Sequence, residues 1–71
     1  MIGTIKFFRN ERGFGFIVRD DDGAHVFFHV NDLAPGTRVG AMTRGCRVAF
    51  DVEQSARGLR AVKVAVLFAS P

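Results

Sequence analysis

The sequence has no tryptophan and no tyrosine, and it holds one cysteine and two prolines in 71 residues. A single Cys46 cannot form a disulfide within the chain, which excludes a disulfide-stabilised secreted scaffold. The longest apolar run, Val64 to Ala69, is far too short for a membrane-spanning helix. Together with the lack of a signal segment, these absences predict a cytoplasmic protein.

A length of 71 residues predicts one small domain over residues 1–71. A domain of this size buries only about 60% of the surface that its unfolded chain exposes. It has no room for a substrate cleft between subdomains, so a binding module is expected and an enzyme is not. Ten Lys and Arg stand against seven Asp and Glu, a net charge of +3. This mild basic excess favours a polyanionic partner, because guanidinium groups form bidentate hydrogen bonds to phosphates and stack on flat rings.

No segment keeps a helical period between caps, and short β-rich runs alternate with Gly, Asp, Asn and Pro. A longer connection over residues 31–45 includes a short helical turn near Asn31–Leu33. The pattern predicts an all-β fold, a five-stranded antiparallel barrel that is closed or partly closed. The five predicted strands are Gly3–Phe8, Gly13–Arg19, His25–Val30, Cys46–Glu53 and Leu59–Phe68.

Alternation along the second and third runs separates two faces of the sheet. If these runs pair through the acidic turn at residues 20–23, Phe14, Phe16, Phe27 and His29 share one face. The other face belongs to a sufficient apolar core, predicted as Ile5, Ile17, Val26, Phe28, Val48, Phe50, Val52 and Val62. An exposed aromatic patch on a small domain indicates a ligand. Nucleobases fit, because each base has a flat face that stacks on an aromatic side chain.

Three motifs carry a resemblance to a known family: Gly-Thr-Ile-Lys-Phe-Phe at residues 3–8, Arg-Gly-Phe-Gly-Phe-Ile at 12–17, and Val-Phe-Phe-His at 26–29. Their order and spacing resemble the cold-shock domain family, over residues 3 to about 64. Residues 65–71 extend beyond the usual end of that domain. The resemblance implies an OB-type barrel that binds single-stranded RNA or DNA with low sequence preference, without a cofactor. An RNA chaperone, or a regulator of transcription or translation, would be the corresponding role.

The resemblance also implies which residues bind. The aromatic residues and His29 would stack on bases, with Phe8 at the rim, while Lys6, Arg12 and Arg57 would meet phosphates or base edges. The full predicted set is Lys6, Phe7, Phe8, Arg12, Phe14, Phe16, Phe27, His29 and Arg57.

This chain departs from the family pattern at several places, three of which concern stacking. Phe7 stands where the family usually has Trp, Val30 stands where an aromatic usually follows the His, and residues 37–39 offer no loop aromatic. Each missing platform would weaken binding by about 1–3 kcal/mol. Guanidinium groups can stack and bind phosphate, so nearby arginines are candidate compensations. These candidates are Arg9, Arg38 and Arg60.

Two alternatives stay open at this point. Residues 65–68 either lengthen the last strand, which is favoured, or form an apolar edge that pairs with a second copy in a homodimer. The aromatic patch and this edge would then make a protein-interaction or oligomerisation module, whose binding would respond little to salt.

A zinc site from His25, His29 and Cys46 is disfavoured, because three scattered ligands do not make a closed tetrahedron.

Overall fold

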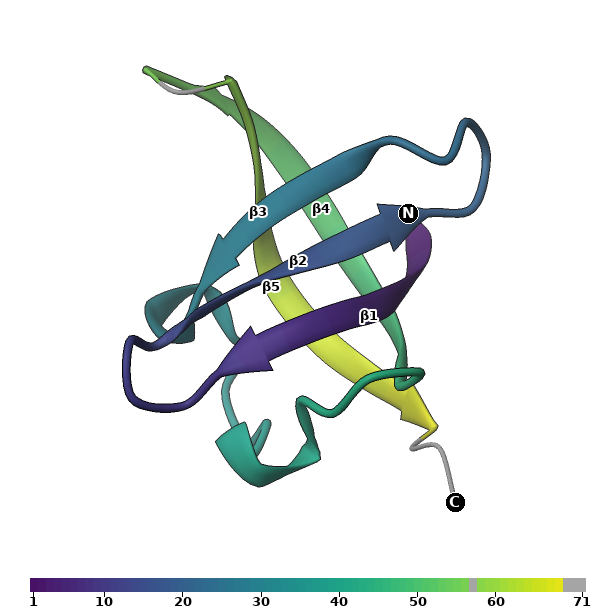
Figure 1. The fold of residues 1–71 in the computed structure, drawn as a ribbon. Helices are drawn as coiled ribbons and strands as arrows, with labels where there is room; N and C mark the ends of the chain where they lie inside the picture. Colours follow the sequence, from purple (N-terminus) through teal and green to yellow (C-terminus); the bar gives the residue numbers. More distant parts are fainter. Residues whose placement is uncertain (57, 69–71) are drawn as a thin grey trace.

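The computed structural model describes residues 1–56 and 58–68, and Figure 1 shows them as a small barrel of strongly bent strands. Two short 3-10 turns interrupt the long connection between the third and fourth strands. The elements are β1 (Ile2–Arg9), β2 (Phe14–Arg19), β3 (His25–His29), η1 (Val30–Asp32), η2 (Val39–Ala41), β4 (Arg47–Ser55) and β5 (Gly58–Phe68). The predicted all-β, five-stranded barrel is therefore confirmed, with each strand boundary within two residues of its expected place.

The strand order around the closed barrel is β1-β2-β3-β5-β4. Four of the five neighbouring pairs are antiparallel, whereas β3 and β5 run parallel and meet where Phe27 pairs with Arg60. The expectation of a purely antiparallel barrel was wrong in this detail. The reason is parity: directions that alternate around a ring cannot close on an odd number of strands, so one pair must be parallel.

The register of β1 shifts between Ile5 and Phe7 as it pairs with β2. Such a bulge adds one residue to a strand and reverses the faces of the residues after it. Ile5 is buried, Lys6 is exposed, and Phe7 lies on the outer face with the β2 aromatics. Simple alternation from Ile5 would have put Phe7 inside the barrel.

A second irregularity lies in β5, where the register against β4 shifts and Lys63 has a φ of 53°. Ala61 and Val64 are fully buried on either side of it, while Val62 is only half-buried. The prediction that Val62 belongs to the core is therefore wrong, because the bulge turns it outward. The buried core is Ile5, Ile17, Val26, Phe28, Met42, Cys46, Val48, Phe50, Ala61 and Val64, with Val52 packed against it.

The segment from residue 65 to residue 68 continues β5 within the barrel. It pairs with the first residues of β4, Arg47 to Ala49. This is the arrangement of a longer last strand, and the alternative of a homodimer through an open edge gains no support. No helix in the described ranges has the length and apolar character needed to cross a membrane.

Candidate nucleic-acid interface

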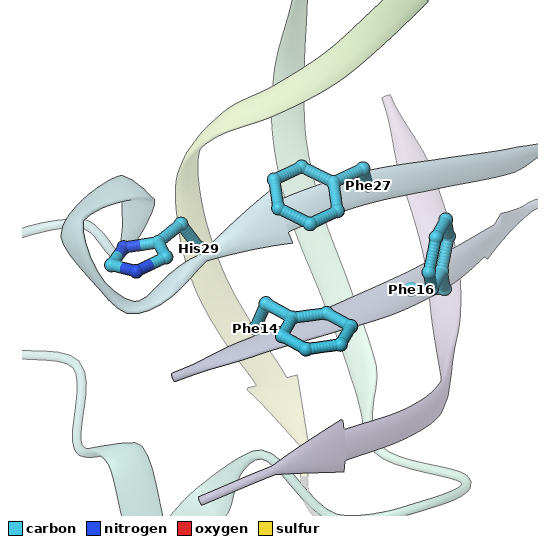
Figure 2. A pocket seen from close by; sticks show the side chains of 4 residues that line it. All are labelled: Phe14, Phe16, Phe27 and His29. Carbon is cyan, nitrogen blue, oxygen red and sulfur yellow. The ribbon is translucent and has the colours of Figure 1, made fainter. Parts of the chain in front are cut away.

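One face of the β2–β3 sheet is hollowed into a depression of about 420 Å³, lined by Phe14, Phe16, Phe27 and His29. Phe14 lies opposite His29 in the β2–β3 ladder, and Phe16 lies opposite Phe27. Figure 2 shows the three phenyl rings on the two strands and His29 at the point where β3 turns into η1. The four residues that the alternation assigned to one face thus share one surface.

The rings that line this hollow contact one another and are also open to solvent on one side. Phe27 lies 5.8 Å from Phe14 in a nearly parallel arrangement and 5.8 Å from Phe16 edge to face. Phe7 of β1 adds a fourth ring, 5.5 Å from Phe16 and 6.4 Å from Phe14. Phe7, Phe14, Phe16 and Phe27 are called the aromatic cluster below. Mutual contacts at these separations are favourable and hold each ring in place before any ligand arrives.

Gly15 allows β1 to approach β2 closely enough to bring Phe7 into the cluster. A Cβ atom at position 15 would lie 2.4 Å from the carbonyl oxygen of Phe7. Arg9 then places its guanidinium carbon 5.5 Å from the centre of the Phe7 ring, a cation–π contact. Arg9 therefore adds a flat, charged group beside the cluster.

His29 is fixed at the open end of the hollow by the start of η1. Its Nδ1 accepts a hydrogen bond from the backbone N–H of Asn31 at 3.1 Å, and its own backbone N–H donates to Oδ2 of Asp32 at 2.9 Å. Because Nδ1 accepts, the proton of the neutral imidazole resides on Nε2. The ring can thus stack on a base and can also donate a hydrogen bond from Nε2.

Comparison with known proteins identifies the family to which this barrel belongs. The family model described as the 'Cold-shock' DNA-binding domain matches residues 1–67. The chain belongs to the cold-shock domain family. Members of this family bind nucleic acids.

Curated relatives and a solved structure agree with this assignment. The chain is 40% identical to "Cold shock-like protein CspA" of Shewanella violacea, over 92% of this chain and 91% of that protein. It is 44% identical to "Cold shock protein CspC" of Bacillus subtilis, over 87% and 91%. A solved structure, "drosophila Unr CSD456", superposes with a TM-score of 0.73 at 27% identity, covering 93% of this chain and 26% of that longer chain.

Phe8, which the cold-shock resemblance put at the rim of the patch, points the other way. Its ring stacks on the buried ring of Phe28 at 5.6 Å and packs against the core. The bulge in β1 explains this, since it sends Phe7 outward and the next residue inward. Phe8 therefore supports the sheet from beneath the aromatic cluster.

The predicted cationic residues differ in what surrounds them. Lys6 and Arg12 are exposed, Arg12 in the turn before β2. Arg57 lies outside the described residues. Of the candidate compensations, Arg38 is exposed at the start of η2, whereas Arg60 is engaged with Asp32.

The remaining family positions supply no further ring. Val30 is the first residue of η1, and Thr37 donates a hydrogen bond from Oγ1 to the carbonyl oxygen of Val64 at 3.3 Å. At these two positions the residues of the cold-shock chain take part in a 3-10 turn and in a hydrogen bond to β5.

Ion pairs at the opposite end of β2 neutralise two further arginines. Arg19 pairs with Asp22 and Asp21, and Arg47 pairs with Asp20 at 2.6 Å. The Arg19 guanidinium and the Ala24 N–H lower the pKa of the Asp22 carboxyl to about 2. A hydrogen bond from Arg47 likewise lowers the pKa of Asp20. The charges at this end of the sheet are therefore close to balanced. Figure 1 shows where the β2–β3 turn lies.

Sequence reasoning missed Asp32, the buried charged residue among those that the structure describes. A usable signal was present: Asp32 follows His29 by three residues at a strand end. That spacing suits a side chain that reaches back to the backbone N–H at the start of a helical turn.

Proposed function

We propose that this chain binds single-stranded RNA or DNA with low sequence preference by stacking bases on Phe14, Phe16, Phe27 and His29. The observation that carries the proposal is the open hollow, in which three phenyl rings and an imidazole face outward from two adjacent strands. A flat ring accepts any base, so affinity arises without recognition of sequence.

Phe7 extends the stacking surface towards β1, and Arg9 adds a guanidinium over that ring. Lys6 and Arg12, both exposed, are proposed to meet phosphates. Arg57 joins this set on the strength of its place in the family motif. Holding single strands extended in this way suits an RNA chaperone or a regulator of transcription or translation.

Fluorescence anisotropy with labelled single strands of about six to ten nucleotides tests the proposal, since OB-type domains bind segments of about 4–16 nucleotides. RNA, DNA and a duplex control are compared at low and at physiological salt. Binding that prefers single strands and weakens with salt is expected, because phosphate contacts release counterions. A lack of binding at low salt would refute the proposal, and salt-insensitive capture of a protein partner would favour a protein-interaction module.

Point variants locate the surface. Phe14→Ala and Phe27→Ala should each weaken single-strand binding about 5- to 150-fold, the equivalent of one stacked base. Leu67→Ala is the matched control, since Leu67 is an apolar side chain of β5 that is 51% exposed. Equal affinity of Phe27→Ala and Leu67→Ala, with both proteins folded, would show that the bases stack elsewhere.

A further inference from the structure

Asp32 is buried to an extent that demands partners for its charge. Its side chain is 4% exposed, and an unpaired carboxylate in such a place is strongly unfavourable. Arg60 supplies the partner, donating from Nη2 to Oδ1 at 2.5 Å and from Nε to both carboxylate oxygens at 3.0 and 3.1 Å. The Asp32 Oδ2 atom also accepts the backbone N–H of His29. The carboxylate is thereby held from two sides.

The ion pair links two parts of the barrel, the β3–η1 segment and β5, that share little backbone pairing. Asp32 ends η1, while Arg60 lies on β5 directly beside Phe27. The described backbone links β3 to β5 through that one register pair, and Leu33 forms an isolated bridge to Val64 just beyond it. The short contact between β3 and β5 is called the seam below. The ion pair connects the turn that follows His29 to β5, across this seam.

We propose that the Asp32–Arg60 ion pair is a positioning device for His29, which keeps the imidazole at the edge of the hollow with Nδ1 occupied and Nε2–H free to donate to a bound base. The inference rests on the proposed function. It makes Arg60 a positioning residue, since its guanidinium is directed to Asp32 and acts on the ligand through η1 and His29.

The physical reason is the unequal exposure of the two partners. Arg60 is 38% exposed and can be solvated, whereas Asp32 cannot be without moving. Loss of Arg60 leaves a buried carboxylate without a cation, and the expected response is that η1 opens to bring Asp32 to water. Such an opening withdraws the Asn31 N–H from Nδ1 and the Asp32 carboxylate from the His29 backbone.

Imidazole nitrogen resonances of His29 report this directly, with no nucleic acid present. In the unaltered protein His29 should show the separated pair of signals of a single Nε2–H tautomer. In Arg60→Gln the two signals should move towards the averaged positions of a tautomer mixture. Exposed His25 serves as an internal reference in the same spectra. An unchanged His29 spectrum in Arg60→Gln would overturn the proposal, whether or not the protein binds nucleic acid.

Binding measurements separate positioning from direct contact with phosphate. Arg60→Gln should weaken single-strand binding, by no more than the loss that His29→Ala causes, about 5- to 150-fold. In the His29→Ala background, Arg60→Gln should have no further effect. Equal fold-losses in both backgrounds, with a shallower salt dependence, would show that Arg60 contacts phosphate itself and would refute the positioning role.

Two controls address folding and charge. Arg47→Gln removes the same charge and breaks an ion pair of similar geometry with Asp20, remote from the hollow, and should leave the His29 resonances unchanged. The double variant Asp32→Asn/Arg60→Gln replaces the buried charge pair by two amides. It should restore a folded η1 and most of the single-tautomer signal. If the double variant is as impaired as Arg60→Gln alone, the buried charge is not the cause.

Discussion

Gly15 determines how closely β1 and β2 approach beneath the aromatic cluster, so Gly15→Ala tests the arrangement on which Phe7 depends. The added Cβ would lie 2.4 Å from the Phe7 carbonyl oxygen and 3.0 Å from both the Phe8 Cα and the Phe28 Cε1. Two of these neighbours are backbone atoms, which cannot rotate away. Gly15 is not among the glycines with a positive φ, so the conflict is one of space alone.

Overpacking of this kind typically destabilises a protein by about 1–3 kcal/mol, and a backbone obstacle places Gly15→Ala near the upper value. A chain of this length has a total stability of roughly 4–10 kcal/mol. A loss of about 3 kcal/mol would lower the Tm by roughly 12–24 °C. We also expect weaker single-strand binding by the folded variant, because strand separation moves Phe7 away from Phe16.

Urea unfolding followed by circular dichroism measures the effect. Gly40→Ala is the matched control, since a Cβ there meets no described atom within 4 Å and Gly40 has no positive φ. That variant should be neutral or more stable by up to about 1 kcal/mol, as fewer unfolded conformations remain. If Gly15→Ala and Gly40→Ala unfold at the same urea concentration, β1 and β2 do not approach as closely as described.

Three further predictions concern stability and access. Lys63→Gly should raise the free energy of unfolding by about 1 kcal/mol, because glycine adopts a left-handed φ without strain. Lys63→Ala keeps the Cβ and should leave the free energy of unfolding unchanged. Equal urea midpoints for Lys63→Gly and Lys63→Ala would contradict this prediction. Because the folded-state pKa of Asp22 is lowered to about 2, its stabilisation is complete above the usual 3.8 and disappears as the pH falls towards 2. The urea midpoints of the unaltered protein and of Asp22→Asn should therefore converge over that range, and a constant difference would count against the Arg19 pairing. Burial raises the pKa of the Cys46 thiol, so a thiol reagent should label it only as fast as the chain unfolds, and immediate labelling of folded protein would place the thiol at the surface.

Alternation and turn residues were enough to predict the strands and the shared face of the hollow. Both signals are local, since a period of two and a Gly or Asp turn can be read within a few residues. They placed Phe14, Phe16, Phe27 and His29 together because β2 and β3 pair without a bulge.

The errors arose where the backbone departs from that period. No residue near Lys6 or Lys63 indicates a bulge. Each bulge reverses the faces of the residues on one side of it relative to those on the other side. Phe7 was assigned to the outer face only by the family resemblance, and Val62 was assigned to the core by alternation alone. A Lys with positive φ is uncommon, so sequence reasoning had no ground to expect one at position 63.

Arg60 illustrates a third limit. An arginine near the binding face is naturally interpreted as a phosphate contact, yet here it neutralises a buried carboxylate. Asp32 and Arg60 are 28 residues apart, and their pairing depends on the parallel contact between β3 and β5, which no local pattern predicts.

The short seam between β3 and β5 also has a consequence for how the barrel comes apart. Pairing runs along the whole of β4 and β5, with two register shifts, whereas β3 and β5 share one register pair in the described chain. Amide hydrogen exchange should accordingly be fastest along this seam, for example at the Ala34 N–H that bonds across it to the Val64 carbonyl.

Opening there would leave β1, β2 and β3 as a three-stranded sheet, which carries all four rings of the aromatic cluster. Phe27 meets Arg60 across the seam through its backbone, whereas the orientation of the His29 ring depends on the contacts of Asp32 with Arg60. A partly open barrel would thus keep its stacking surface and lose only the oriented histidine, so local opening would change the affinity in a graded way.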